Sequence, residues 1–162
     1  RRADGQSPQP PPHRPTATMM SKFAENLFAL MSERGLNAPA LANILKTDRS
    51  NVTRYLHGER LPLFRGFVAI VEYFQVSADV LLGLVDYAPE TEFLPLPPFG
   101  DRLRQVMNET KTTQYRLEKD LNVSGASMYN WLTNASVPTV ENLVKLARYM
   151  EVSVDYLLGR IQ

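Results

Sequence analysis

The sequence contains no cysteine, only two histidines and no apolar run long enough to cross a membrane. The lack of cysteine excludes disulfide scaffolds and thiolate metal sites, and it is compatible with a reducing compartment such as the cytosol. The two histidines, His13 and His57, have no catalytic serine and aspartate pattern or metal-ligand spacing around them, and no glycine-rich phosphate loop is present. We therefore expect a protein that is not an enzyme, needs no cofactor or metal and has no membrane partner.

The sequence also has little net positive charge, since the formal net charge of its 162 residues is only +1. Phosphate contact normally leaves a basic footprint, so this total gives weak support for nucleic-acid binding. The distribution is more informative, since five basic and only two acidic residues lie between Lys46 and Arg65. With 44% apolar residues the chain can bury an ordinary core. We therefore expect a globular protein whose positive charge gathers in one segment.

The centre of this basic segment predicts one short helix with a cap at either end, Asp48 before it and Gly58 after it. Val52, Tyr55 and Leu56 are spaced as an apolar stripe along one side of that helix. Taken alone, its polar side is most simply a solvated surface. The residues left on that outer side are Arg49, Ser50, Thr53, Arg54 and His57.

Two proline-rich segments interrupt the helical pattern. Residues 1–20 contain five prolines and almost nothing that could enter a core, so we expect a disordered leader. Residues 84–98 contain four prolines, but also Tyr87, Phe93 and Leu96. Because a solvated tether rarely contains so many apolar side chains, we expect this linker to pack partly against the folded units.

Residues 21–83, between these segments, predict five helices. Apolar spacing starts the first helix at Phe23, and Asn37 is the expected cap of the second. The basic segment forms the third helix, and the fourth follows the break at Pro62. Ser77 is the expected cap of a short fifth helix.

The same pattern returns later in the chain, because Phe99–Gly159 aligns with Phe23–Gly83 at a constant offset of 76 without a gap. Such self-similarity indicates a repeated structural unit. The sequence therefore predicts an all-α fold with two five-helix domains in tandem, at residues 21–83 and 99–162. Identical residues fall mostly at expected core, cap or helix-end positions, among them Phe23 with Phe99, Leu27 with Leu103, Leu41 with Leu117, Pro62 with Pro138, Ser77 with Ser153, Asp79 with Asp155 and Leu81 with Leu157.

A helix, a tight turn and a second helix with a polar outer side can place that second helix in the DNA major groove. The first copy resembles the Cro and phage-repressor (XRE) type of helix-turn-helix domain at Ser32-Glu33-Arg34-Gly35-Leu36, Leu41-Ala42, Ser50 to Tyr55, Gly58, Pro62 and Val76 to Leu82. The second copy resembles it at Gln114, Leu117, Ser124, Ser127, Met128, Pro138 and Val152 to Leu158. The resemblance implies two lambda-repressor-like domains in a cytoplasmic, nucleoid-associated transcriptional regulator, a repressor, whose partner is double-stranded DNA.

The resemblance also implies that the third helix of each copy contacts base edges and that the start of the second helix contacts phosphate. Arginine can donate two hydrogen bonds to guanine, and Asn51 could pair with adenine, although Ser50 and Asn51 could also merely be solvated. Carried onto this chain, the expected DNA-binding residues are Arg49, Ser50, Asn51, Arg54, His57 and Arg60 in the first copy and Gln114, Ser127 and Asn130 in the second.

The second copy departs from the first on its outer side. Its third helix has no positive charge, and Asn134 replaces Gly58 as the expected left-handed cap. Conversely, Gln114 is replaced by Ala38 in the first copy. Two alternatives follow: the copies read unlike half-sites, or the second copy or the linker binds a protein partner or a second copy of the chain. The basic leader has a similar alternative, as an arm in the DNA minor groove.

Overall fold

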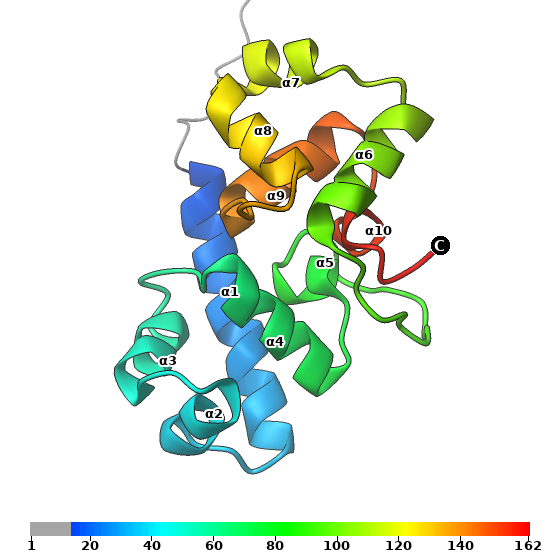
Figure 1. The fold of residues 1–162 in the computed structure, drawn as a ribbon. Coiled ribbons are helices and arrows are strands. Elements are labelled where there is room, and N and C mark those ends of the chain that lie inside the picture. The colour runs from blue at the N-terminus through cyan, green and yellow to red at the C-terminus, as the bar shows by residue number, and fades with distance from the viewer. Residues whose placement is uncertain (1–13) are drawn as a thin grey trace, which may run out of the picture.

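The computed structural model describes residues 14–162, and these residues form ten helices and no strand (Figure 1). The N-terminal half contains α1 (Arg14–Glu33), α2 (Ala38–Leu45), α3 (Arg49–Leu56), α4 (Phe64–Phe74) and α5 (Ala78–Leu81). The C-terminal half contains α6 (Phe99–Glu109), α7 (Gln114–Leu121), α8 (Gly125–Leu132), α9 (Val140–Tyr149) and α10 (Val154–Leu158). No helix in residues 14–162 is both long and apolar enough to span a membrane.

Helix α1 begins earlier than the sequence suggested. Residues 14–20 are helical, so the expected disordered leader is wrong for them. Pro15 lies in the first turn of α1, where its missing N–H removes no hydrogen bond, and Met19 is only 5% exposed. Burial of this side chain against the core favours continuing the helix toward the N-terminus. Residues 1–13, including His13, lie outside the described part of the chain.

The helix caps predicted for residues 21–83 are formed, with one exception. Asn37 accepts a hydrogen bond from the Ala40 N–H and Ser77 accepts one from the Val80 N–H, as predicted for N-caps. Gly58 has a φ of +69°, as predicted for the residue that ends α3. The predicted side-chain cap at Asp48 is wrong. The backbone carbonyl of Asp48 accepts the Asn51 N–H instead, and the exposed carboxylate stays in solvent.

The buried residues of the two halves form one continuous hydrophobic cluster. Most of the identical apolar pairs are buried in both halves, as expected for core positions. Examples are Phe23 with Phe99, Leu27 with Leu103, Leu41 with Leu117 and Leu81 with Leu157. The repeated pattern therefore indicates equivalent core positions in the two halves.

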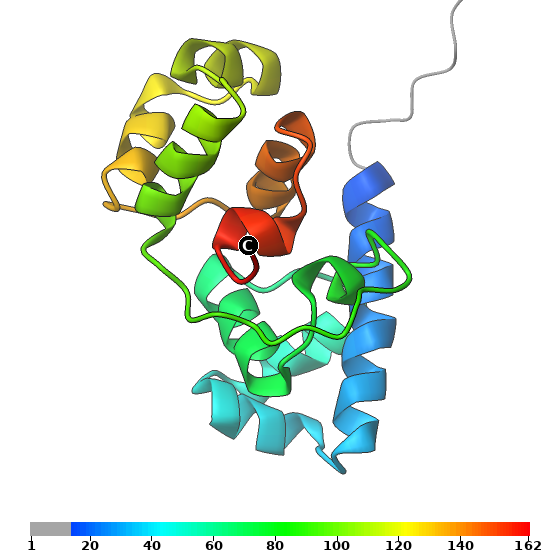
Figure 2. The ribbon, with the colours of Figure 1, turned by 90° about the vertical axis from the view of Figure 1, so that its right-hand side faces the viewer.

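The halves meet where α10 packs against α5 (Figure 2). The linker lies along this boundary, and its Leu94 N–H donates to the carbonyl of Arg160 over 2.8 Å. The Arg160 guanidinium lies 3.9 Å from the centroid of the Phe93 ring. The expectation that part of the linker packs is confirmed by these contacts, whereas Tyr87 remains exposed.

Candidate nucleic-acid interface

Helices α2 and α3 are joined by a tight turn. Lys46 ends α2 with a φ of +56°, and the Thr47 N–H then donates to the carbonyl of Ala42 over 2.9 Å. Asn122, which is equivalent in the repeat, ends α7 with a φ of +54°. Because a side chain in this left-handed region is uncommon, its occurrence in both halves indicates that the turn geometry itself is required.

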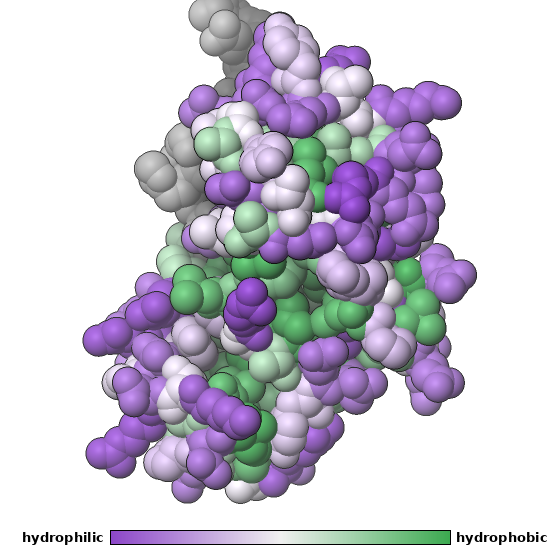
Figure 3. Space-filling view, viewed as in Figure 1, coloured by the Kyte–Doolittle hydropathy of each residue, from purple (hydrophilic) through white to green (hydrophobic). Residues whose placement is uncertain are grey.

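Helix α3 has one buried and one exposed side. Val52 and Tyr55 are buried, which confirms the predicted apolar stripe. Arg49 and Arg54 are exposed on the other side, together with Ser50 and Thr53. Hydrophilic residues gather over this end of the molecule, at the lower left of Figure 3. The two guanidinium groups are therefore free to reach a partner in solvent.

The other predicted DNA-binding residues of the N-terminal half are less accessible than Arg49 and Arg54. Asn51 is half-buried, and its amide donates to Thr47 Oγ1 over 2.8 Å, which fastens the start of α3 to the turn. His57 is exposed, but its Nδ1 lies 3.4 Å from the carboxylate of Glu59. Arg60 is half-buried, and its charge acts on the buried Tyr55 hydroxyl, whose pKa is raised by burial and partly lowered by Arg60. Arg49 and Arg54 are thus the most accessible of the predicted cations.

In the C-terminal half both helices of the equivalent pair have a side-chain N-cap, whereas in the N-terminal half α2 has one and α3 has none. The Thr113 hydroxyl accepts the Arg116 N–H before α7, and the Ser124 hydroxyl accepts the Ser127 N–H before α8. The Ser124 hydroxyl also donates to Ser127 Oγ, which engages one of the predicted DNA-binding residues in the cap. Gln114 is exposed but donates to the carboxylate of Glu118 over 2.7 Å. Asn130 is exposed on the outer side of α8.

Each helix of this second pair exposes a tyrosine, and α8 carries no cation on its outer side. Tyr115 and Tyr129 are 70% and 65% exposed. The positive charge lies on α7 instead, where Arg116 and Lys119 are exposed and the Lys119 ammonium is 6.0 Å from the centroid of the Tyr115 ring. Sequence reasoning missed both cations, although the position of Arg116 in the first turn of the second helix of the copy was a usable signal; Lys119 lies in the last turn of that helix.

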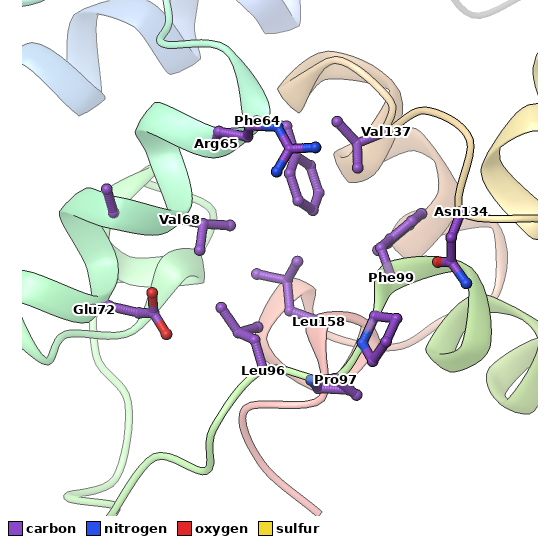
Figure 4. A pocket seen from close by; sticks show the side chains of 12 residues that line it. Phe64, Arg65, Val68, Glu72, Leu96, Pro97, Phe99, Asn134, Val137 and Leu158 are labelled. Carbon is purple, nitrogen blue, oxygen red and sulfur yellow. The ribbon is translucent and has the colours of Figure 1, made fainter. Parts of the chain in front are cut away.

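A cleft of about 410 Å³ lies at the boundary between the halves (Figure 4). Its walls are mostly apolar, and the Phe64 and Phe99 rings meet edge to face with centroids 5.4 Å apart. Arg65 and Glu72 supply charge from the α4 side. The cleft is formed by residues from both halves and therefore depends on how they are held together. Among the described residues, no group of three or more histidines and carboxylates could hold a metal ion.

Comparisons with known proteins agree with a helix-turn-helix in the C-terminal half. Residues 103–157, which contain α7 and α8, match the family model HTH_3, described as helix-turn-helix. Two curated relatives are similar to part of the chain. The cryptic phage CTXphi transcriptional repressor RstR of Vibrio cholerae is 33% identical over 60 residues, which is 37% of this chain and 54% of the relative. The uncharacterized HTH-type transcriptional regulator YobD of Bacillus subtilis is 36% identical over 61 residues, which is 38% of this chain and 54% of the relative.

The chain thus spans about half the length of the curated relatives that it matches. No solved structure matches it. The chain therefore contains a helix-turn-helix region that is similar to parts of proteins named as transcriptional regulators.

Proposed function

We propose that the chain is a sequence-specific DNA-binding transcriptional regulator, a repressor, built from two helix-turn-helix domains in tandem at residues 21–83 and 99–162. Helix α3 enters the major groove as the main reading element, and α8 contacts a second half-site. The observation that carries this proposal is the exposed side of α3, where Arg49 and Arg54 face solvent opposite the buried stripe. Paired donors of this kind suit guanine O6 and N7.

The other predicted residues take supporting roles in this proposal. Ser50 and Asn51 lie at the start of α3, where Asn51 both fixes the turn and can face adenine. His57 and Arg60 lie near the DNA backbone beyond the end of α3. In the second domain Gln114 contacts phosphate, and Ser127 and Asn130 lie at the groove. Joining two half-site contacts in one chain converts the second contact into an intramolecular step.

Selection of preferred sequences from a random DNA pool, followed by titration at several salt concentrations, tests this proposal. Arg49→Ala combined with Arg54→Ala should cost about 1 to 3 kcal/mol for each lost bidentate contact and relax specificity at those bases. Lys145→Ala with Arg148→Ala is the matched control, because it removes the same charge from the exposed side of α9. Absence of any preferred sequence, or equal losses in both double variants, would reject the proposal.

A second candidate function is supported by Tyr115 and Tyr129, which expose two large rings where a DNA-reading surface would carry cations. In this alternative the second domain or the linker binds a protein partner or a second copy of the chain, because exposed aromatic groups are typical anchors of protein interfaces. A nuclease footprint separates the alternatives. Protection of two half-sites by a monomer supports the first. Protection of one half-site, with self-association that Tyr115→Ser plus Tyr129→Ser abolishes, supports the second.

A further inference from the structure

The contact between α5 and α10 contains a reciprocal exchange of carboxylates. Asp155 accepts the Ser77 hydroxyl over 2.6 Å and the Ala78 N–H over 3.0 Å, at the start of α5. Asp79 accepts the N–H groups of Val154 and Asp155 over 2.8 and 2.9 Å, at the start of α10. Each half therefore caps the short helix of the other half.

The exchange follows the sequence repeat, because Asp79 and Asp155 are equivalent at the offset of 76. Each helix also has its own serine cap, since Ser77 accepts the Val80 N–H and Ser153 accepts the Tyr156 N–H. The carboxylates accept hydrogen bonds from first-turn N–H groups that these serines do not bind. The same surface on each half thus binds its equivalent, which is the self-complementary arrangement of an isologous interface.

Arg160 makes this contact asymmetric, and its side chain connects the two halves. Arg160 is 1% exposed, and its Nη1 lies 2.6 Å from Asp155 Oδ1. The same guanidinium donates to the carbonyls of Val76 and Val71 in the N-terminal half, over 2.7 and 3.2 Å. Because a buried charge is costly without partners, an orientation of the halves that kept the guanidinium buried but moved it away from these two carbonyls would leave it partly unsatisfied.

Equivalent side chains connect this contact to the rest of each half. The Asn26 amide of α1 donates to the carbonyls of Val80 and Leu81 in α5. Arg102 of α6, its equivalent in the repeat, donates twice to the carbonyl of Tyr156 in α10. Helix α1 in turn packs on α3, and α6 packs on α8. A change in the α5–α10 contact would therefore move α3 relative to α8.

In the view of Figure 1 the two helices lie above and below the α5–α10 contact. In Figure 1, α3 is at the lower left and α8 at the upper left, and both are to the left of α5 and α10. We propose that the carboxylate clasp, defined as Ser77, Asp79, Asp155 and Arg160, fixes the separation and angle of α3 and α8. The clasp thereby determines which spacing between two DNA half-sites the chain binds, a role that rests on the proposed function.

Distance measurement between spin labels tests the clasp without DNA. The chain has no cysteine, so Ser50→Cys on α3 and Ala126→Cys on α8 give two unique labelling positions, both exposed. A single narrow distance distribution is expected in the otherwise wild-type chain. Asp79→Ala should broaden it, and Asp79→Asn should keep it narrow, because asparagine still accepts one N–H and can donate to Asp155. Glu151→Ala, at an exposed acid, is the matched control.

The second measurement is affinity for paired half-sites whose spacing is varied one base pair at a time. The wild-type chain should lose about tenfold in affinity when one half-site is moved by half a helical turn, and Asp79→Ala should reduce that loss to less than about threefold. Affinity for a single half-site should not change. A broad wild-type distance distribution, or Asp79→Ala and Arg160→Met variants that keep the wild-type distribution, overturns the clasp. Failure to find any preferred DNA sequence would reject the proposed function. The distances between the labels would still show whether the clasp fixes α3 relative to α8.

Discussion

Helices α3 and α8 occupy equivalent positions in the repeat, yet they present different chemistry. Their buried sides match, because Val52 and Tyr55 correspond to Met128 and Trp131, all four buried. Their exposed sides differ, since glycine and asparagine stand in α8 where α3 has arginine. Packing constrains the volume and polarity of the buried stripe, whereas solvent places no such constraint on the outer side. A sequence repeat can therefore keep the buried positions of a helix while its exposed positions diverge.

The comparison extends to two further positions. Arg160 follows the last glycine of the C-terminal half, and the equivalent residue in the N-terminal half is Leu84. Asp48 precedes α3 without a side-chain cap, whereas Ser124 caps α8. Substitutions at these equivalent pairs can show whether the differences affect stability, binding or neither.

The largest effect is expected at Arg160. Arg160→Met should lower the free energy of unfolding by about 3 to 5 kcal/mol, because it leaves the buried Asp155 carboxylate without its cation. Leu84→Ala, at the equivalent half-buried position, should cost less than half as much. Urea denaturation measures both. Adding Asp155→Asn to Arg160→Met should recover part of the loss, and a double variant no more stable than Arg160→Met would contradict this account.

The next effect is a pH dependence that originates at Asp79. Burial raises the pKa of Asp79 to about 6; the N–H groups of Asp155 and Val154 oppose the shift, and the Asp155 carboxylate adds to it. The folded pKa lies above the unfolded value of about 3.9, so the folded state binds more protons between these values. The free energy of unfolding should therefore rise as the pH falls from about 7 to about 4, by an amount on the order of 2 kcal/mol.

Asp79→Asn should remove this part of the pH dependence, because the amide does not titrate in this range. Chemical denaturation at several pH values compares the variant with the wild-type chain. Glu151→Gln, at an exposed acid, is the matched control and should leave the pH dependence of the free energy of unfolding unchanged. If Asp79→Asn leaves the pH dependence of the free energy of unfolding unchanged, then a group other than Asp79 takes up the proton.

Helix spacing and core positions were predictable because each depends on contacts within one half. The stripe of Val52 and Tyr55 follows from helical periodicity, and the repeat supplied the same helices in the C-terminal half. The clasp was not predictable in this way. A carboxylate in the first turn fits ordinary capping of its own helix, so Asp79 gave no sign that it caps another. Arg160 lies just beyond the last identical pair, and its burial depends on both halves at once.

A smaller effect is expected when the outer side of α8 is made to resemble α3. Gly125→Arg combined with Asn130→Arg places cations at the positions equivalent to Arg49 and Arg54. DNA affinity should rise about tenfold at low salt, and the plot of log affinity against log salt should steepen by up to about 2. Fluorescence titration across a salt series measures both quantities. Gly125→Ala with Asn130→Ala is the control, and a similar gain there would show that charge is not responsible.

The smallest effect should distinguish the start of α8, which has a side-chain cap, from the start of α3, which has none. Ser124 accepts the Ser127 N–H over 3.0 Å, so Ser124→Ala should lower the free energy of unfolding by about 1 kcal/mol. Asp48→Ala should cost less than about 0.5 kcal/mol, because it removes only the favourable charge near the start of α3. Asp48→Ser should stabilise the chain if a serine there adopts the Ser124 geometry. Equal losses in the two alanine variants, measured by urea denaturation, would mean that the Asp48 carboxylate caps α3 in solution and that the two helix starts are alike.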